Sequence, residues 1–214
     1  MNGAKAWFCA TAMALALGAG CFYSPIVSPD VLEPGQSTAG ASIYGASAGP
    51  VLSYFHYTSI YGRCGLGGGF DMGFGYTWPL GVYVDGKRQV TKQPLSAFDL
   101  CLSVDRRASS FEDSLGGYPP CWVPGVTPSF VIGTDYLYGG VQVLTGAEVV
   151  QPRPQFYYFP GVIAGASYLT DENPFRIVPS LGLFLDPHLG LRPLRWLASA
   201  GVAVMFDFGI ATEE

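Results

Sequence analysis

In one stretch of the chain, Leu66 to Trp78, bulky apolar residues alternate with small or polar residues at even and odd positions. Its sequence is LGGGFDMGFGYTW, in which even positions are bulky and apolar apart from one glycine, while odd positions are glycine, aspartate or threonine. A period of two indicates an extended strand with one apolar face and one small or polar face. The apolar face ends in Tyr76 and Trp78, side chains that favour the boundary between hydrocarbon and water. The pattern predicts a transmembrane β-strand with lipid on one side and a narrow polar interior on the other.

Two later segments repeat this alternation. Segment 95–105 alternates apolar residues with aspartate, cysteine and serine, and segment 196–209 alternates them with small residues and one aspartate. The first two segments and the region 136–169 alternate less clearly, so a count of eight or twelve strands stays open beside ten. The ten strand-like segments that we expect are 36–46, 51–61, 66–78, 80–86, 95–105, 126–135, 136–146, 155–169, 176–186 and 196–209.

The parity also predicts which way side chains face. The positions predicted to face lipid or the aromatic rim are Phe70, Phe74, Tyr76, Trp78, Phe206 and Phe208. A carboxylate in hydrocarbon is costly, so the polar parity should face the lumen. The predicted lumen residues are Asp71, Asp99, Asp105 and Asp207.

The lumen acids allow two interpretations. One is a cation-preferring pore, and the other is an interior filled by charges paired with Arg63, Arg176 or Arg195. Barrels of this size fill with side chains and leave little channel, which favours the filled interior.

Composition agrees with a membrane-embedded all-β protein. Only 13% of residues are charged, against roughly a quarter in soluble domains. After residue 20, no apolar run reaches the roughly 20 residues that a transmembrane helix needs. The net charge of −5 offers no basic surface for nucleic acid. We therefore expect an antiparallel, up-and-down transmembrane β-barrel.

The N-terminus has the features of an export signal. Lys5 supplies a positive charge, Ala6 to Leu17 is apolar, and small residues precede Cys21, an arrangement that resembles a bacterial lipobox. Lipidation of Cys21 and ordinary cleavage nearby both remain open. The expected organisation is a signal peptide at 1–20, a proline-rich tether at 21–35, a barrel at 36–210 and a short tail at 211–214.

Connection lengths predict the orientation, because bacterial barrels have short periplasmic turns and longer outer loops. With the N-terminus in the periplasm, the long segments 106–125, 146–154 and 187–195 should face outward. The turns at 62–65, near Asp135 and at 170–174 should face the periplasm, and the long segment 86–94 is the exception.

The segments LEPGQSTAGASIYG and YGRCGLGGGFDMGFGYTWPLGVYVDGKRQV resemble small bacterial outer-membrane β-barrel proteins over about residues 32 to 90. The resemblance implies the outer membrane of a Gram-negative-type bacterium, with membrane lipid, the barrel-assembly machinery and the lipoprotein-sorting machinery as partners. It implies no cofactor and no known chemistry. Such barrels usually end on an aromatic residue, whereas here GIATEE follows Phe208.

Candidate chemistry is sparse. Cys101 and Cys121 are the pair that could form a disulfide on this topology, and unpaired thiols are the alternative. No cysteine or histidine spacing predicts a metal site, and the only histidines, His56 and His188, lack a suitable nucleophile nearby. We expect no enzymatic activity.

The predicted function is that of a lipid-anchored outer-membrane β-barrel with a structural, small-ligand-binding or minor transport role. The alternative is a tethered soluble β-sandwich acting as a binding module in the envelope, since a sandwich also hides one face of each strand. A solvated outer face should carry many lysines, glutamates and threonines. The polar parity here is mainly glycine, serine and alanine, which favours the barrel.

Overall fold

The structure is a computed structural model, and several segments of the chain fall outside its description. The signal peptide, Cys21, the first part of the tether, Arg195 and the tail are among them. Among the described residues, no helix has the length and apolar character needed to cross a membrane. The described residues are 28–48, 54–78, 81–107, 121–134, 136–150, 153–170, 173–185 and 196–209.

Apart from residues 28–35 and the short turns, the described residues form strands. The short strand β9 continues β8 after a break at Ser167, so the eleven strand segments make ten barrel strands. The segments are β1 (Gln36–Ala48), β2 (Tyr54–Gly67), β3 (Phe70–Trp78), β4 (Gly81–Lys92), β5 (Leu95–Arg107), β6 (Cys121–Gly133), β7 (Leu137–Val150), β8 (Arg153–Ala166), β9 (Tyr168–Thr170), β10 (Asn173–Leu185) and β11 (Trp196–Gly209).

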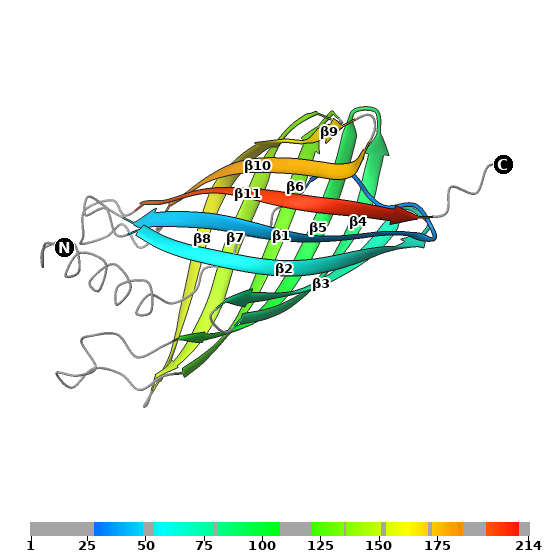
Figure 1. Ribbon diagram of the computed structural model, residues 1–214. Coiled ribbons are helices and arrows are strands. Elements are labelled where there is room, and N and C mark those ends of the chain that lie inside the picture. The colour runs from blue at the N-terminus through cyan, green and yellow to red at the C-terminus, as the bar shows by residue number, and fades with distance from the viewer. Residues whose placement is uncertain are drawn as a thin grey trace, which may run out of the picture.

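The sheet closes on itself (Figure 1). Each strand pairs antiparallel with its neighbours in the chain, and β11 pairs with both β10 and β1. The predicted fold class, an antiparallel up-and-down barrel of about ten strands, is confirmed. A single closed sheet also rules out the alternative β-sandwich, which would need two sheets packed face to face.

Two predicted boundaries are wrong at the start of the barrel. The turn between β2 and β3 lies at Gly68–Gly69, and not at 62–65, so Leu66 belongs to β2. Gly67, Gly68 and Gly69 have φ values of 93°, 63° and 71°, which residues with a Cβ rarely adopt. Glycine alternation therefore concealed a hairpin turn.

Longer strands also change two predicted loops. β4 continues to Lys92 and turns at Gln93–Pro94, so the exceptional loop at 86–94 does not exist. β7 and β8 extend toward each other and leave only 151–152 between them, so the long loop at 146–154 is wrong as well. The strand ends that border 68–69, 93–94, 134–136 and 171–172 lie at one end of the barrel, called here the short-turn end. The strand ends that border the longest connections, 108–120 and 186–195, lie at the opposite end.

The outer wall carries exposed apolar side chains arranged in three zones. The middle zone is predominantly aliphatic. An aromatic ring lies near the short-turn end and consists of Phe98, Phe130, Tyr136, Tyr168, Phe175, Phe206 and Phe208, all exposed. A second ring lies toward the opposite end and consists of Trp78, Trp122, Phe156 and Tyr158, also exposed.

The interior is filled by two kinds of side chain. On the side formed by β6, β7, β8 and β10, buried apolar residues fill the lumen, among them Val131, Leu144, Val178 and Phe184. We call this the apolar side. On the side formed by β2 to β5, charged residues fill it, and we call this the charged side.

Candidate functional site

The charged side places acids and bases at adjacent inward positions of neighbouring strands. The register aligns Asp71 of β3 with Lys87 of β4, and Lys87 in turn with Asp99 of β5. Asp85 lies two residues from Lys87 on β4 and so shares its inward face. All four side chains are buried, which brings residues far apart in the sequence into one charged cluster.

Arg63 of β2 joins the cluster by bridging two carboxylates. Its guanidinium donates to Asp71 through one terminal nitrogen and to Asp85 Oδ2 at 2.5 Å through the other. Lys87 Nζ lies 3.8 Å from Asp71 Oδ2 on the other side of the same carboxylate. A guanidinium with donors pointing in two directions suits this bridging position better than a lysine would.

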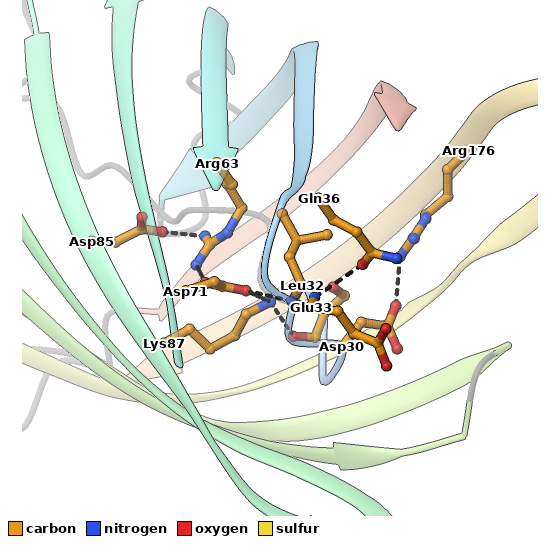
Figure 2. A network of polar contacts seen from close by, with 10 residues as sticks. Asp30, Leu32, Glu33, Gln36, Arg63, Asp71, Asp85, Lys87 and Arg176 are labelled. Carbon is orange, nitrogen blue, oxygen red and sulfur yellow. Dashed lines mark hydrogen bonds and ion pairs between the residues drawn. The ribbon is translucent and has the colours of Figure 1, made fainter. Parts of the chain in front are cut away.

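The chain before β1 enters the barrel and completes the cluster (Figure 2). The backbone N–H of Leu32 donates to Asp71 Oδ2 at 3.0 Å, and Lys87 Nζ donates to the carbonyl oxygen of Ser28 at 3.2 Å. Ser28 and Pro29 are buried. We call Ser28–Gly35 the plug, because it lies across the lumen; the sequence analysis expected a tether at 21–35.

The plug is also held on the opposite wall. Arg176 of β10 donates to Asp30 of the plug at 2.5 Å and to Asp207 of β11 at 3.1 Å. These three side chains are partly exposed, with 11% exposure for Arg176 and 25% for Asp30, so solvent screens each of these contacts in part. The plug is thereby attached to β3, β4 and β10 at once.

A hydrogen-bonded turn at the end of the plug and a glycine in the wall allow the plug to run close to β2. The chain turns into β1 through mutual hydrogen bonds of Glu33 and Gln36, with the Gln36 N–H donating to the Glu33 carbonyl at 3.0 Å. At Gly65 of β2, a Cβ would lie 1.9 Å from the Glu33 carbonyl oxygen. Only glycine allows the plug to pass this close to the wall.

One acid of the cluster is left without a donor. Among the described residues, none donates a hydrogen bond to either carboxylate oxygen of Asp99, and Asp85 Oδ1 also lacks a donor. The cluster of Asp71, Asp85 and Asp99 against Arg63 and Lys87 therefore has one more acid than bases. A buried acid without a donor costs stability.

The remaining space beside the plug is small. A cavity of about 30 Å³ lies between plug residues such as Ser28 and Asp30 and wall residues such as Tyr61, Tyr83 and Met205. This space holds roughly one or two water molecules. Within the described ranges, no group of three or more histidine, cysteine or acidic side chains is placed to hold a metal ion.

The predicted site residues lie as follows. Asp71 and Asp99 are fully buried and Asp105 is 4% exposed, whereas Asp207, at the end of β11, keeps 28% of its side chain exposed. Of the positions predicted to face lipid, Phe70 and Tyr76 are half-buried, and the exposed ones are Phe74, Trp78, Phe206 and Phe208.

The predicted disulfide is not formed. The register pairs Cys101 with Thr127 and Cys121 with Arg107, so the two cysteines lie at different heights, roughly 20 Å apart along the strands. A disulfide needs Cα atoms within about 7 Å. Cys101 is a buried free thiol, and Cys64 is an exposed one.

Sequence reasoning missed Asp30, Asp85 and Lys87. Asp85 and Lys87 share one parity in VYVDGKRQV, a signal that was available once β4 is extended beyond Gly86. Asp30 lies in a proline-rich segment without periodicity, where no local pattern indicates an inward path.

Comparison with known proteins gives only remote likenesses. No protein-family model matches the sequence, and no curated protein sequence matches it. The translocator domain of the autotransporter NalP from Neisseria meningitidis is similar at 10% identity and a TM-score of 0.42, covering 84% of this chain and 90% of that one. Neisserial surface protein A is similar at 13% and 0.37, covering 81% and 96%. Ail from Yersinia pestis is similar at 10% and 0.36, covering 82% and 99%.

Proposed function

We propose that this protein is an outer-membrane β-barrel with a structural role, whose lumen is closed by its own N-terminal plug. The observation that supports the closed state best is the attachment of the plug to three strands through Asp71, Lys87 and Arg176. A barrel held shut by its own chain stabilises the membrane wall around it and offers solutes no free path. The absence of enzymatic activity is part of this proposal.

The membrane assignment is supported by the outer wall. Two aromatic rings flank a mainly aliphatic zone, the arrangement that a bilayer with two interfaces favours. On β6, the stretch from Trp122 to Phe130 connects the rings over roughly 26 Å of strand. The strand segments other than the short β9 contain 9 to 14 residues, enough for tilted strands to cross the hydrocarbon.

The orientation follows from the connections. Short turns face the periplasm in bacterial barrels, which would place the short-turn end and the plug on the periplasmic side. The N-terminal signal supports export, and an anchor at Cys21 would also lie on that side. Lipidation of Cys21, the barrel-assembly and lipoprotein-sorting machineries as partners, and the short tail after the barrel remain parts of this proposal.

The pairing of charges argues against a cation-preferring pore. Arg63, Lys87 and Arg176 pair with all the carboxylates of the lumen and plug discussed above except those of Asp99 and Asp105, so few remain free to attract cations. The apolar side of the lumen adds Val131, Leu144 and Phe184, which block passage without any charge. A role in binding a small ligand inside the barrel is disfavoured by the size of the cavity beside the plug, about 30 Å³.

Two measurements test the proposal together. The protein extracted from the outer-membrane fraction should migrate faster on a gel without boiling, because a closed barrel resists detergent. In planar bilayers at moderate voltage it should pass no steady current. A single band with or without boiling would contradict the barrel in the membrane, and steady open-channel currents would contradict the closed lumen.

A variant pair sharpens the test. Asp30→Asn combined with Arg176→Gln removes the contact between the plug and β10, and it should increase the frequency of brief openings. Glu33→Gln is the matched control, because Glu33 is an exposed plug residue with no ion pair among the contacts of the described residues. Equal opening frequencies in the double variant and the control would show that the plug does not close the lumen.

A further inference from the structure

The outer wall is indented on one side of the barrel. A furrow of about 690 Å³ crosses β1, β11, β10 and β8 and ends at the start of β7. Its lining is almost wholly apolar, and it lies on the outside, because most of its larger residues are exposed. Small residues form its floor, namely Gly45, Ala164 and Ala200, and larger ones form its edges, namely Ile43, Leu181 and Val202.

The part of the wall formed by β3 to β5 has larger outward side chains. Its outward positions include Met72, Phe74, Val84 and Leu102, all exposed. These side chains cover the backbone, whereas Gly45, Ala164 and Ala200 leave it close to the surface. The floor of small residues therefore distinguishes the furrow from the wall of β3 to β5.

The furrow coincides with an interruption between strands. β8 and β10 are paired from Gly161 to Gly165, and pairing with β10 resumes only at Tyr168 of β9. Pro179 lies in this gap and has no N–H to donate. Behind the furrow, the Tyr138 hydroxyl fills the space inside Gly165, where a Cβ would lie 2.2 Å from it. The floor of the furrow therefore consists of backbone with small side chains, and the Tyr138 side chain packs against its inner face at Gly165.

The furrow runs from the rim to the middle of the wall. One end is at Leu137, next to the exposed Tyr136 of the aromatic ring at the short-turn end. The other end is at Ile43 and Val202, near the middle of β1 and β11. A phospholipid has the same layout, with its headgroup at the aromatic ring and its chain reaching the membrane centre.

We propose that this furrow binds one acyl chain of a phospholipid from the periplasmic leaflet. The inference rests on the proposed membrane function, which makes hydrocarbon the medium around the furrow. A second copy of the barrel fits less well, because two convex walls meet along a narrow line and leave a furrow unfilled. The apolar lining excludes a polar ligand, since nothing in the furrow would replace its bonds to water.

Photocrosslinking in nanodiscs tests the proposal. The nanodiscs consist of phosphatidylethanolamine and phosphatidylglycerol, with a small share of phosphatidylethanolamine carrying a diazirine in the middle of its acyl chain. After irradiation, peptides from β10 and β11 should carry severalfold more adduct than peptides from β3 and β5. Ala200→Phe should fill the furrow and remove this excess.

Ala39→Phe is the matched control, because Ala39 is an outward alanine of β1 that does not line the furrow. It should keep the excess, and gel mobility without boiling should show both variants folded. Adducts spread evenly over the wall, or an excess that survives Ala200→Phe, would overturn the acyl-chain site while leaving the membrane barrel intact. Crosslinked dimers through β10 or β11 would assign the furrow to a second copy and overturn the proposal too. A folded protein without adducts on any strand would contradict the membrane function itself.

Discussion

The two sides of the lumen are both filled by buried side chains, but these are charged on one side and apolar on the other. On the charged side, Arg63 and Lys87 pair with Asp71 and Asp85 behind an outer wall of Met72 and Phe74. On the apolar side, Val131, Leu144, Val178 and Phe184 belong to one buried apolar cluster behind an equally apolar outer wall. Both sides bury their inward side chains, so the outer face of a strand is constrained to be apolar while the inner face can be charged or apolar.

The difference has an energetic consequence. Apolar residues contribute stability through burial alone and tolerate small changes of shape. A buried ion pair contributes little net stability, yet the loss of one partner leaves a charge without compensation. The charged side should therefore be the more vulnerable to single substitutions, and it is also where the plug is attached.

The largest effect is expected from placing a charge on the apolar side. Val178 is fully buried, and Val178→Asp would bury a carboxylate with no cation opposite it. The cost of several kcal/mol should prevent the barrel from closing. Gel mobility of the unboiled protein checks this, with Val178→Ala as the control that keeps the folded band. A folded Val178→Asp barrel would mean that the apolar side admits water.

The next largest effect should come from the charged side. Arg63→Met would remove the cation that Asp71 and Asp85 share and lower the free energy of unfolding by about 3–5 kcal/mol. Guanidinium unfolding in detergent micelles, followed by tryptophan fluorescence, measures the change. Arg88→Met, at an exposed position of β4, should change the free energy by less than about 1 kcal/mol. Similar losses in both variants would show that the buried charged cluster contributes no more to the free energy of unfolding than an exposed arginine does.

A truncation on the apolar side should cost somewhat less. Leu144→Ala would leave a cavity in the buried apolar cluster and lower the free energy of unfolding by about 2–4 kcal/mol. The same unfolding measurement applies. Leu144→Met, which preserves volume, should cost less than about 1.5 kcal/mol. If Met costs as much as Ala, the side chain does not act through packing.

The contrast between the two sides also explains what the sequence could predict. In β3 and β5 the inner face carries Asp71 and Asp99, whereas the outer face is apolar. The sequence alone therefore indicates which side chains of these strands point inward. In β6 to β8 the inner face carries Val131 and Leu144, so both faces are apolar and the alternation fades. The barrel was predictable from the strands that alternate clearly, whereas eight, ten and twelve strands all stayed open because the alternation fades in this part of the chain.

The plug was not predictable for a different reason. Ser28–Gly35 contains two prolines and no period, and such a segment is equally compatible with an external tether. Its inward path depends on Asp71, Lys87 and Arg176, which lie far away in the sequence. Glycine was ambiguous at Gly67 to Gly69, because a missing side chain fits an inner strand face and a turn equally well.

The smallest predicted effect has the opposite sign. Asp99 is buried without a hydrogen-bond donor among the described residues, in a cluster with one acid too many. Asp99→Asn removes that excess, leaving Asp71 and Asp85 balanced by Arg63 and Lys87, so the free energy of unfolding should rise by about 1 kcal/mol. Asp85→Asn is the matched comparison, because Asp85 does accept from Arg63 and its loss should destabilise the barrel. A gain in Asp99→Asn beside a loss in Asp85→Asn would show that the charged side is stabilised by its pairs and strained by its one unpaired acid. A loss in both would mean that Asp99 holds a counterion of its own, and the two sides of the lumen would then differ in hydration as well as in charge.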